Sequence, residues 1–219
     1  MVVILAGYNK QMEAFFAHNP GLPSRIPYQL QFEDYGDSEL LQILQSQIEK
    51  KYNGTMRVED GLGGLYMRIA ARRIGRGRGR DGFGNARAVH NAFAQITDRQ
   101  AKRLQKERRA SPPPDDMLLT KFDLLGQEPS GALKNSKAWT ELQGLIGLKS
   151  VKDSVTSLFD SIKANYDREL EEMPLVEYSL NRVFLGSPGT GKTSVGKLYG
   201  QILADIGLLT SGEGKQAVQ

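Results

Sequence analysis

An eight-residue glycine-rich segment constrains the fold of this chain more than any other feature. Residues 186–193 read GSPGTGKT, which has the G-x-x-x-x-G-K-[ST] spacing of a phosphate-binding P-loop. The apolar run 183–185 before it predicts a short buried strand, and apolar residues at spacings of three and four after it predict a helix. Strand, glycine turn and helix follow in the order that the motif requires. The segment therefore predicts an α/β fold that binds a nucleoside triphosphate.

The residue types within this segment fit phosphate and metal chemistry. Gly186, Gly189 and Gly191 allow a tight turn whose N–H groups converge on an anion. Lys192 would reach the terminal phosphates, and the Thr193 hydroxyl would ligate Mg²⁺. We expect ATP and Mg²⁺ to be bound by Gly186, Ser187, Pro188, Gly189, Thr190, Gly191, Lys192, Thr193 and Ser194.

Composition excludes several other classes of protein. The 219 residues contain no cysteine, so disulfides and thiolate metal sites are absent. The net charge of +4 is modest, and no apolar run approaches the length of a membrane span. The apolar start at residues 2–6 is too short for the core of a signal peptide. We expect a soluble, intracellular protein of the cytoplasm or nucleus, without a membrane partner.

The first third of the chain alternates between strand and helix patterns. The continuous apolar run 1–7 predicts a strand buried on both faces, and the alternation at 28–32 predicts a second strand. A short helix is predicted over 10–17. A longer helix is predicted to run to about Tyr52, capped by Asp37 or Ser38.

Further helices are predicted on both sides of a proline-rich segment. The patterns indicate helices from residue 61 or 62 to 73, from 84 to about 104, and over 151–162. Three consecutive prolines at 112–114 cannot continue a helix and favour an extended spacer. We therefore expect residues 111–138 to be a linker.

Long motifs in both halves of the chain resemble one family. The first half contains VVILAGYNKQMEAFFAHNPGLPSR and GNARAVHNAF, and the second contains GLIGLKSVKDSV and NRVFLGSPGTGKTSVGKLYGQIL. These motifs resemble AAA+ ATPases of the CbbX and stage V sporulation protein K type, which include fungal proteins with tandem modules. The resemblance covers roughly residues 1–108 and 140–212. Residues 1–108 resemble the C-terminal half of a module, and 140–212 resemble the N-terminal half.

This order implies a segment that ends one module and begins the next. By the resemblance, residues 1–36 are the C-terminal part of a first α/β core and 37–110 its all-α helical lid. The linker 111–138 follows, and 139–219 are the N-terminal half of a second core, with the Walker A motif. The implied fold class is a P-loop NTPase (AAA+) with pieces of parallel sheet, an all-α lid and incomplete modules.

The resemblance also implies roles for individual residues. Arg25 lies at the position of the arginine finger, which acts on the ATP of a neighbouring subunit and implies a ring, usually a hexamer. Arg87 matches the sensor 2 arginine of the lid. Either Tyr8 or Asn9 falls at the sensor 1 position, where Asn9 has the more usual residue type. Ile146 and Gly147 lie in the segment that packs around adenine.

Two functions remain open at this point. The family implies ATP hydrolysis that drives remodelling of a protein substrate, which the sequence does not name. However, the chain has no Walker B pattern of four apolar residues followed by Asp-Glu, because Asp115-Asp116 follow prolines and Glu171-Glu172 lie in a polar stretch. We expect this chain alone to bind ATP without hydrolysing it. The alternative is a segment without turnover that binds a nucleotide or interacts with RNA or protein.

A glycine-arginine tract raises a competing RNA-binding interpretation. Residues 76–80 read RGRGR, a short version of tracts found in proteins that bind single-stranded nucleic acid. Phe83 is the one aromatic residue nearby, and the tract lies where the lid has a loop between two helices. We favour a lid loop over a nucleic-acid site.

Overall fold

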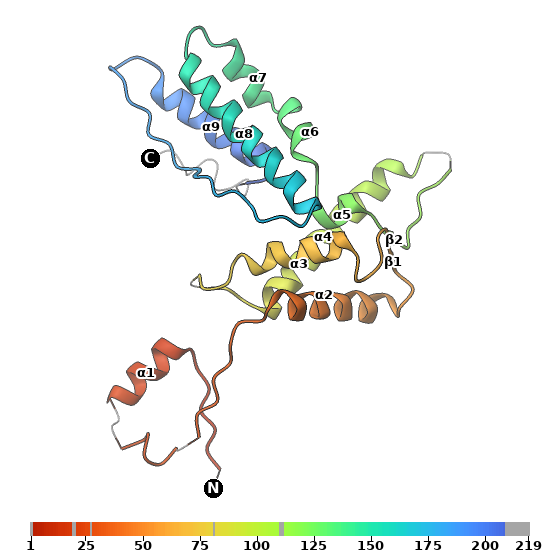
Figure 1. Cartoon of the computed structure of the whole chain (residues 1–219), viewed down its shortest axis with the longest axis vertical. Helices are drawn as coiled ribbons and strands as arrows, with labels where there is room; N and C mark the ends of the chain where they lie inside the picture. Colours follow the sequence, from red (N-terminus) through yellow and green to blue (C-terminus); the bar gives the residue numbers. More distant parts are fainter. Residues whose placement is uncertain (1, 19–20, 27, 81, 110–111, 209–219) are drawn as a thin grey trace. The chain divides into compact units, whose positions relative to one another are not determined.

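A computed structural model describes residues 2–18, 21–26, 28–80, 82–109 and 112–208 (Figure 1). It separates into two compact units, of which the first ends at Asp34 and the second begins at Tyr35. The expectations for Met1, for Asn19 and Pro20 of the arginine-finger motif, and for 209–219 lie outside the described residues. No helix in the described part of the chain is long and apolar enough to cross a membrane.

The described part of the first unit contains one helix, and segments without regular structure lie on either side of it. Helix α1 spans Asn9–His18, which confirms the helix expected there. The expected strands at 1–7 and 28–32 are wrong for the described residues, which have no regular structure at these positions. Ile4 is 86% exposed and Phe32 91% exposed. A strand is stabilised by hydrogen bonds to a neighbouring strand, and within the described ranges only β1 and β2 of the second unit pair in this way.

Three helices form the centre of the second unit's first half. They are α2 (Asp37–Tyr52), α3 (Leu65–Gly75) and α4 (Ala86–Glu107), as expected from their apolar spacing. The N-cap of α2 is Gly36, not Asp37 or Ser38, and the Glu39 carboxylate accepts the Gly36 N–H at 2.7 Å. The apolar sides of the three helices share one core, which includes Leu40, Leu44 and Ile48 of α2, Met67 and Ile69 of α3, and Val89, Phe93 and Ile96 of α4.

Residues 111–138 differ from the expected linker. Strand β2 (Leu118–Leu119) pairs in parallel with β1 (Arg57–Val58), with Arg57 opposite Leu118 and Val58 opposite Leu119. Helix α5 (Lys121–Leu125) follows, and Leu119, Leu124 and Leu125 are buried in the core of α2–α4. Helix α6 (Pro129–Lys134) comes next. Apolar side chains after the prolines thus fold 118–125 onto the helices before them.

A second core joins the remaining helices, α7 (Lys137–Gly144), α8 (Lys149–Leu170) and α9 (Lys192–Asp205). Val155, Leu158 and Ile162 of α8 share it with Val195, Tyr199 and Ile202 of α9, and α7 adds Ala138 and Leu142. The strand expected at 183–185 is wrong: this run has no regular structure. Phe184 still packs its ring edge-on against Tyr199, with the ring centroids 6.0 Å apart.

Candidate nucleotide site and lid

The glycine-rich turn before α9 contains two glycines with left-handed backbone. Gly189 and Gly191 have φ values of +81° and +80°, in the left-handed region where residues with a Cβ are strained. The Thr190 hydroxyl donates to the Ser187 carbonyl at 2.8 Å and closes the turn. Gly191 is the N-cap of α9. The turn therefore presents the N-terminus of a fourteen-residue helix, whose free N–H groups and positive dipole end attract anions.

Lys192 occupies the position that the motif predicts, at the first residue of α9. Its Nζ donates to the carbonyls of Gly186 and Ser187, both at 2.8 Å. The ammonium therefore lies against the loop that would surround the phosphates. A phosphate oxygen is a stronger acceptor than either carbonyl, so a bound nucleotide can take over these bonds.

The hydroxyls of Thr193 and Ser194 lie exposed in the first turn of α9. One hydroxyl with phosphate oxygens and water suits Mg²⁺, which keeps several of its waters. Within the described ranges, no cluster of three or more histidine or acidic residues could hold a metal ion on its own. A cation at this turn would therefore depend on the nucleotide's phosphates for much of its coordination.

The expected adenine segment lies directly before α8. Ile146 is 99% exposed, and Gly147 has a φ of +74°. Leu148, the N-cap of α8, is also left-handed at +57°. Lys152 holds this turn by donating to the carbonyls of Leu145 at 2.7 Å and Gln143 at 2.9 Å. The exposed Ile146 side chain is thus available to a flat ligand.

The remaining expected site residues are divided between the two units. Arg25 and Asn9 belong to the first, where Arg25 is exposed in a turn closed by its N–H donating to the Leu22 carbonyl at 2.9 Å. Asn9 is the exposed first residue of α1, directly after the exposed Tyr8. Arg87 belongs to the second unit, as does the P-loop.

Arg87 lies in the exposed first turn of α4. Its N–H donates to the Gly84 carbonyl at 2.8 Å. The preceding Asn85 has a φ of +48°, and its Oδ1 accepts the Tyr35 N–H at 2.9 Å. This bond ties the start of α4 to the segment that leads into α2, and so fixes the backbone from which Arg87 projects.

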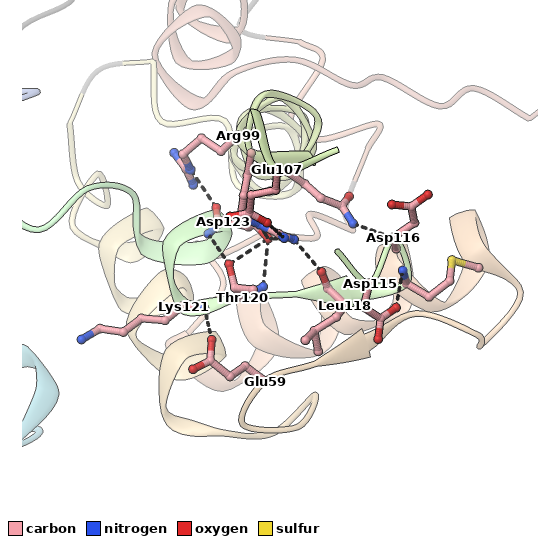
Figure 2. Close-up of polar contacts among 12 residues, drawn as sticks. Glu59, Arg99, Glu107, Asp115, Asp116, Leu118, Thr120, Lys121 and Asp123 are labelled. Atoms are coloured by element: carbon pink, nitrogen blue, oxygen red, sulfur yellow. Dashed lines mark hydrogen bonds and ion pairs between the residues drawn. The ribbon is translucent and has the colours of Figure 1, made fainter. Parts of the chain in front are cut away.

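The lid contains a buried ion pair that the sequence reasoning missed. Asp123 of α5 is fully buried, and both of its carboxylate oxygens accept hydrogen bonds from Arg103 of α4 at 2.9–3.1 Å. The Thr120 N–H and hydroxyl also donate to Asp123, at 2.9 and 3.0 Å (Figure 2). The one signal in the sequence was the Thr120-x-x-Asp123 spacing, which resembles a helix-capping box.

A second arginine of α4 anchors the same helix. Arg99 donates to the carbonyl of Asp123 at 2.7 Å (Figure 2). It also donates to the carbonyl of Leu124 at 3.0 Å. Burial lowers the pKa of Arg99, whereas the hydrogen bonds from Arg103 to Asp123 raise the pKa of Arg103. Both guanidinium groups hold α5 against α4. These contacts join α4 to α5, so both arginines position α5.

The glycine-arginine tract is packed into the second unit. Arg76 forms an ion pair with Glu169, and Arg78 forms one with Asp37. A Cβ at Gly77 would come within 2.8 Å of the Phe83 ring, so this turn lies close against its neighbours. These contacts favour the interpretation of a lid loop.

Comparison with known proteins finds similarity in the region of α2–α5. Residues 36–132 match the family model described as an AAA lid domain. The chain is 40% identical to Protein CbbX of Cereibacter sphaeroides over 105 residues, which cover 48% of this chain and 31% of that protein. It is 35% identical to the chloroplastic ribulose bisphosphate carboxylase/oxygenase activase of Cyanidioschyzon merolae over 136 residues, which cover 62% of this chain and 41% of that protein. Residues 36–132 are thus similar to the AAA lid domain, and the chain is similar to CbbX-type proteins.

The region similar to the AAA lid domain extends further along the chain than residue 110. The family model continues to residue 132, and the structure explains why: β2 and α5 complete the core of α2–α4. The same resemblance includes a CfxQ homolog of Galdieria sulphuraria, 37% identical over 62% of this chain and 40% of that protein. The chain thus spans less than half the length of the curated AAA+ relatives that it matches.

Proposed function

We propose that this CbbX-type AAA+ chain binds ATP with Mg²⁺ at residues 186–194. The observation that carries the proposal is the left-handed turn at Gly189 and Gly191. This turn leads directly into α9, whose first residue is Lys192. Backbone N–H groups of this turn would hold the phosphates, and Lys192 would exchange its two carbonyl bonds for phosphate oxygens. Thr193 would ligate the metal ion, and the exposed Ile146 would contact adenine.

We further propose that the parent protein couples ATP hydrolysis to remodelling of a protein substrate in a ring, usually a hexamer. Arg25 would act on the ATP of a neighbouring subunit, and Arg87 on the ATP held by its own module, with Asn9 as sensor 1. The lid precedes the P-loop along this chain. Lid and P-loop would therefore belong to successive modules and serve different nucleotides.

A second candidate function is nucleotide binding without turnover. One member of each acidic pair forms an ion pair within the chain: Asp115 with Arg57, and Glu172 with Arg68 and Arg72. Phosphate release shows whether this chain itself hydrolyses ATP. Turnover that Lys192→Ala abolishes would establish hydrolysis by this chain, whereas binding without phosphate release would show that this chain by itself only binds the nucleotide.

Binding itself is tested by titrating the protein with a fluorescent ATP analogue in the presence of Mg²⁺. Lys192→Ala should weaken binding at least tenfold, because it removes the one ammonium at the turn. Lys197→Ala is the matched control, since Lys197 is exposed in the same helix beyond the first turn. Equal affinities for wild type and Lys192→Ala would refute the site.

A further inference from the structure

Four arginines of the lid converge on two carboxylates near the C-terminal end of α8. Glu169 accepts from Arg73 Nε at 3.1 and 3.2 Å and from Arg73 Nη2 at 2.6 Å, and it also pairs with Arg76. Its side chain is 9% exposed. A carboxylate this buried requires compensation, and two guanidinium groups supply it.

Glu172 makes the second set of contacts. Arg68 binds it with both prongs, Nε to Oε1 and Nη2 to Oε2 at 3.0 Å each, and Arg72 pairs with it as well. The hydrogen bond from Arg68 and the charges of both arginines hold the pKa of Glu172 below its usual range. The two-pronged geometry fixes orientation as well as distance.

The backbone at Glu172 shows that this carboxylate is placed with some strain. Helix α8 ends at Leu170, and Glu172 has a φ of +56°, in the left-handed region. The Met173 N–H donates to the Arg168 carbonyl at 2.8 Å, which closes the end of the helix. Glycine is the usual residue at such a position because it has no Cβ. A glutamate here is explained by its contacts with Arg68 and Arg72.

Other contacts join the same two surfaces. Leu170 packs against the apolar core of the lid. Lys121 of α5 lies over the rings of Tyr66 in α3 and Tyr166 in α8, with its Nζ 5.8 and 5.3 Å from their centroids. Ionic, apolar and cation–π contacts thus all join the lid to the C-terminal end of α8.

We propose that α3 and α5 of the lid form a docking surface whose partner is the C-terminal end of α8, locked by the pairing of Glu169 and Glu172 with arginines. Nearer its N-terminal end, α8 shares an apolar core with α9, the helix that follows the P-loop. Docking therefore makes the lid and the helices of the following P-loop segment one mechanical body. A displacement of α8 would be passed to the lid, whether or not this P-loop binds a nucleotide.

The chain contains no cysteine, so two introduced cysteines provide the only sites for nitroxide labels. Ala94→Cys in α4 and Ala164→Cys in α8 are both at exposed positions. In the full chain, pulsed electron resonance should give a single narrow distance between them. Adding Glu169→Gln and Glu172→Gln together should broaden that distribution. Glu171→Gln, which removes a neighbouring exposed carboxylate, should leave it narrow.

Two further variants separate docking from folding. Glu172→Gly relieves the left-handed backbone and removes the carboxylate, so we expect it to broaden the distance while far-ultraviolet circular dichroism stays that of the wild type. Glu172→Arg should also broaden it, and adding Arg68→Glu should narrow it again. A broad distance in the labelled parent, or a narrow one in the Glu169→Gln, Glu172→Gln variant, would overturn the proposal.

Discussion

Substitution of Asp123 by asparagine would test what holds α5 in the lid. The change keeps the shape of the side chain but removes its charge, while Arg103 stays in place. The Arg103 side chain is 11% exposed, and its other carboxylate partner is Glu107, 3.1 Å away at the surface. Asparagine can still accept one hydrogen bond from Thr120, so the capping interaction is largely kept.

The expected loss follows from the burial of both partners. Removing one member of a buried ion pair costs about 3–5 kcal/mol, because the other charge is left without compensation. Folded domains are typically stable by only about 5–15 kcal/mol, so this loss would be a large fraction of the total. The control is Asp98→Asn, which breaks the exposed Lys102–Asp98 pair at 2.7 Å and should cost no more than about 0.5 kcal/mol.

Urea unfolding followed by circular dichroism measures both variants. Asp123→Asn should shift the midpoint far below that of Asp98→Asn, with the slope unchanged. Combining Asp123→Leu with Arg103→Met should recover most of the loss, since apolar side chains can replace a buried pair. Losses below about 1 kcal/mol for Asp123→Asn would refute the view that this pair holds α5 in place.

Three further predictions concern the lid and its docking surface. Burial alone would raise the pKa of Glu169, but Arg73 and Arg76 outweigh it and hold that pKa below the ordinary 4.5. The stabilisation from Glu169 is therefore present above pH 4.5 and is lost as the pH falls further. Below pH 4.5, the melting temperature of the wild type should fall more steeply with decreasing pH than that of Glu169→Gln. Leu44→Ala empties a fully buried site of the core and should cost about 2–5 kcal/mol in urea unfolding. Gly64→Ala would place a Cβ 1.8 Å from the Asp60 carbonyl oxygen and should destabilise the lid by at least about 1–3 kcal/mol. The control is Gly144→Ala, whose added Cβ meets no neighbouring atom, so this variant should not lower the melting temperature.

The helices could be predicted from the sequence because their hydrogen bonds are local. Apolar spacing located both ends of α2 and α4 to within a few residues, and the start of α8, which continues eight residues beyond the predicted end at 162. The strands could not be predicted in the same way, because a strand depends on a partner that may be distant in the chain. The run 183–185 has the composition of a strand but forms none. Strands β1 and β2 have only two residues each, and their paired residues are 61 positions apart in the sequence, as between Arg57 and Leu118.

In the candidate nucleotide site, too, the local backbone could be predicted from the sequence and the side-chain contacts could not. The turn at Gly189 and Gly191 was predictable because left-handed glycines and the start of α9 are set within eight residues. The contacts of Lys192 with Gly186 and Ser187 depend on side-chain geometry that the motif does not state. The pairing of Arg103 with Asp123 joins residues 20 apart, and that of Arg68 with Glu172 joins residues 104 apart. Periodicity carries no information about such pairs.

Hydrogen exchange with and without Mg²⁺-ATP would test the central claim, that residues 186–194 hold the nucleotide. Phosphate binding buries the N–H groups of the turn and of the first turn of α9, so amides in 186–195 should exchange more slowly with the nucleotide present. Lys192→Ala should remove that protection, and Lys197→Ala should retain it. Unchanged exchange across 186–195 at saturating nucleotide, or protection confined to other segments, would contradict the account.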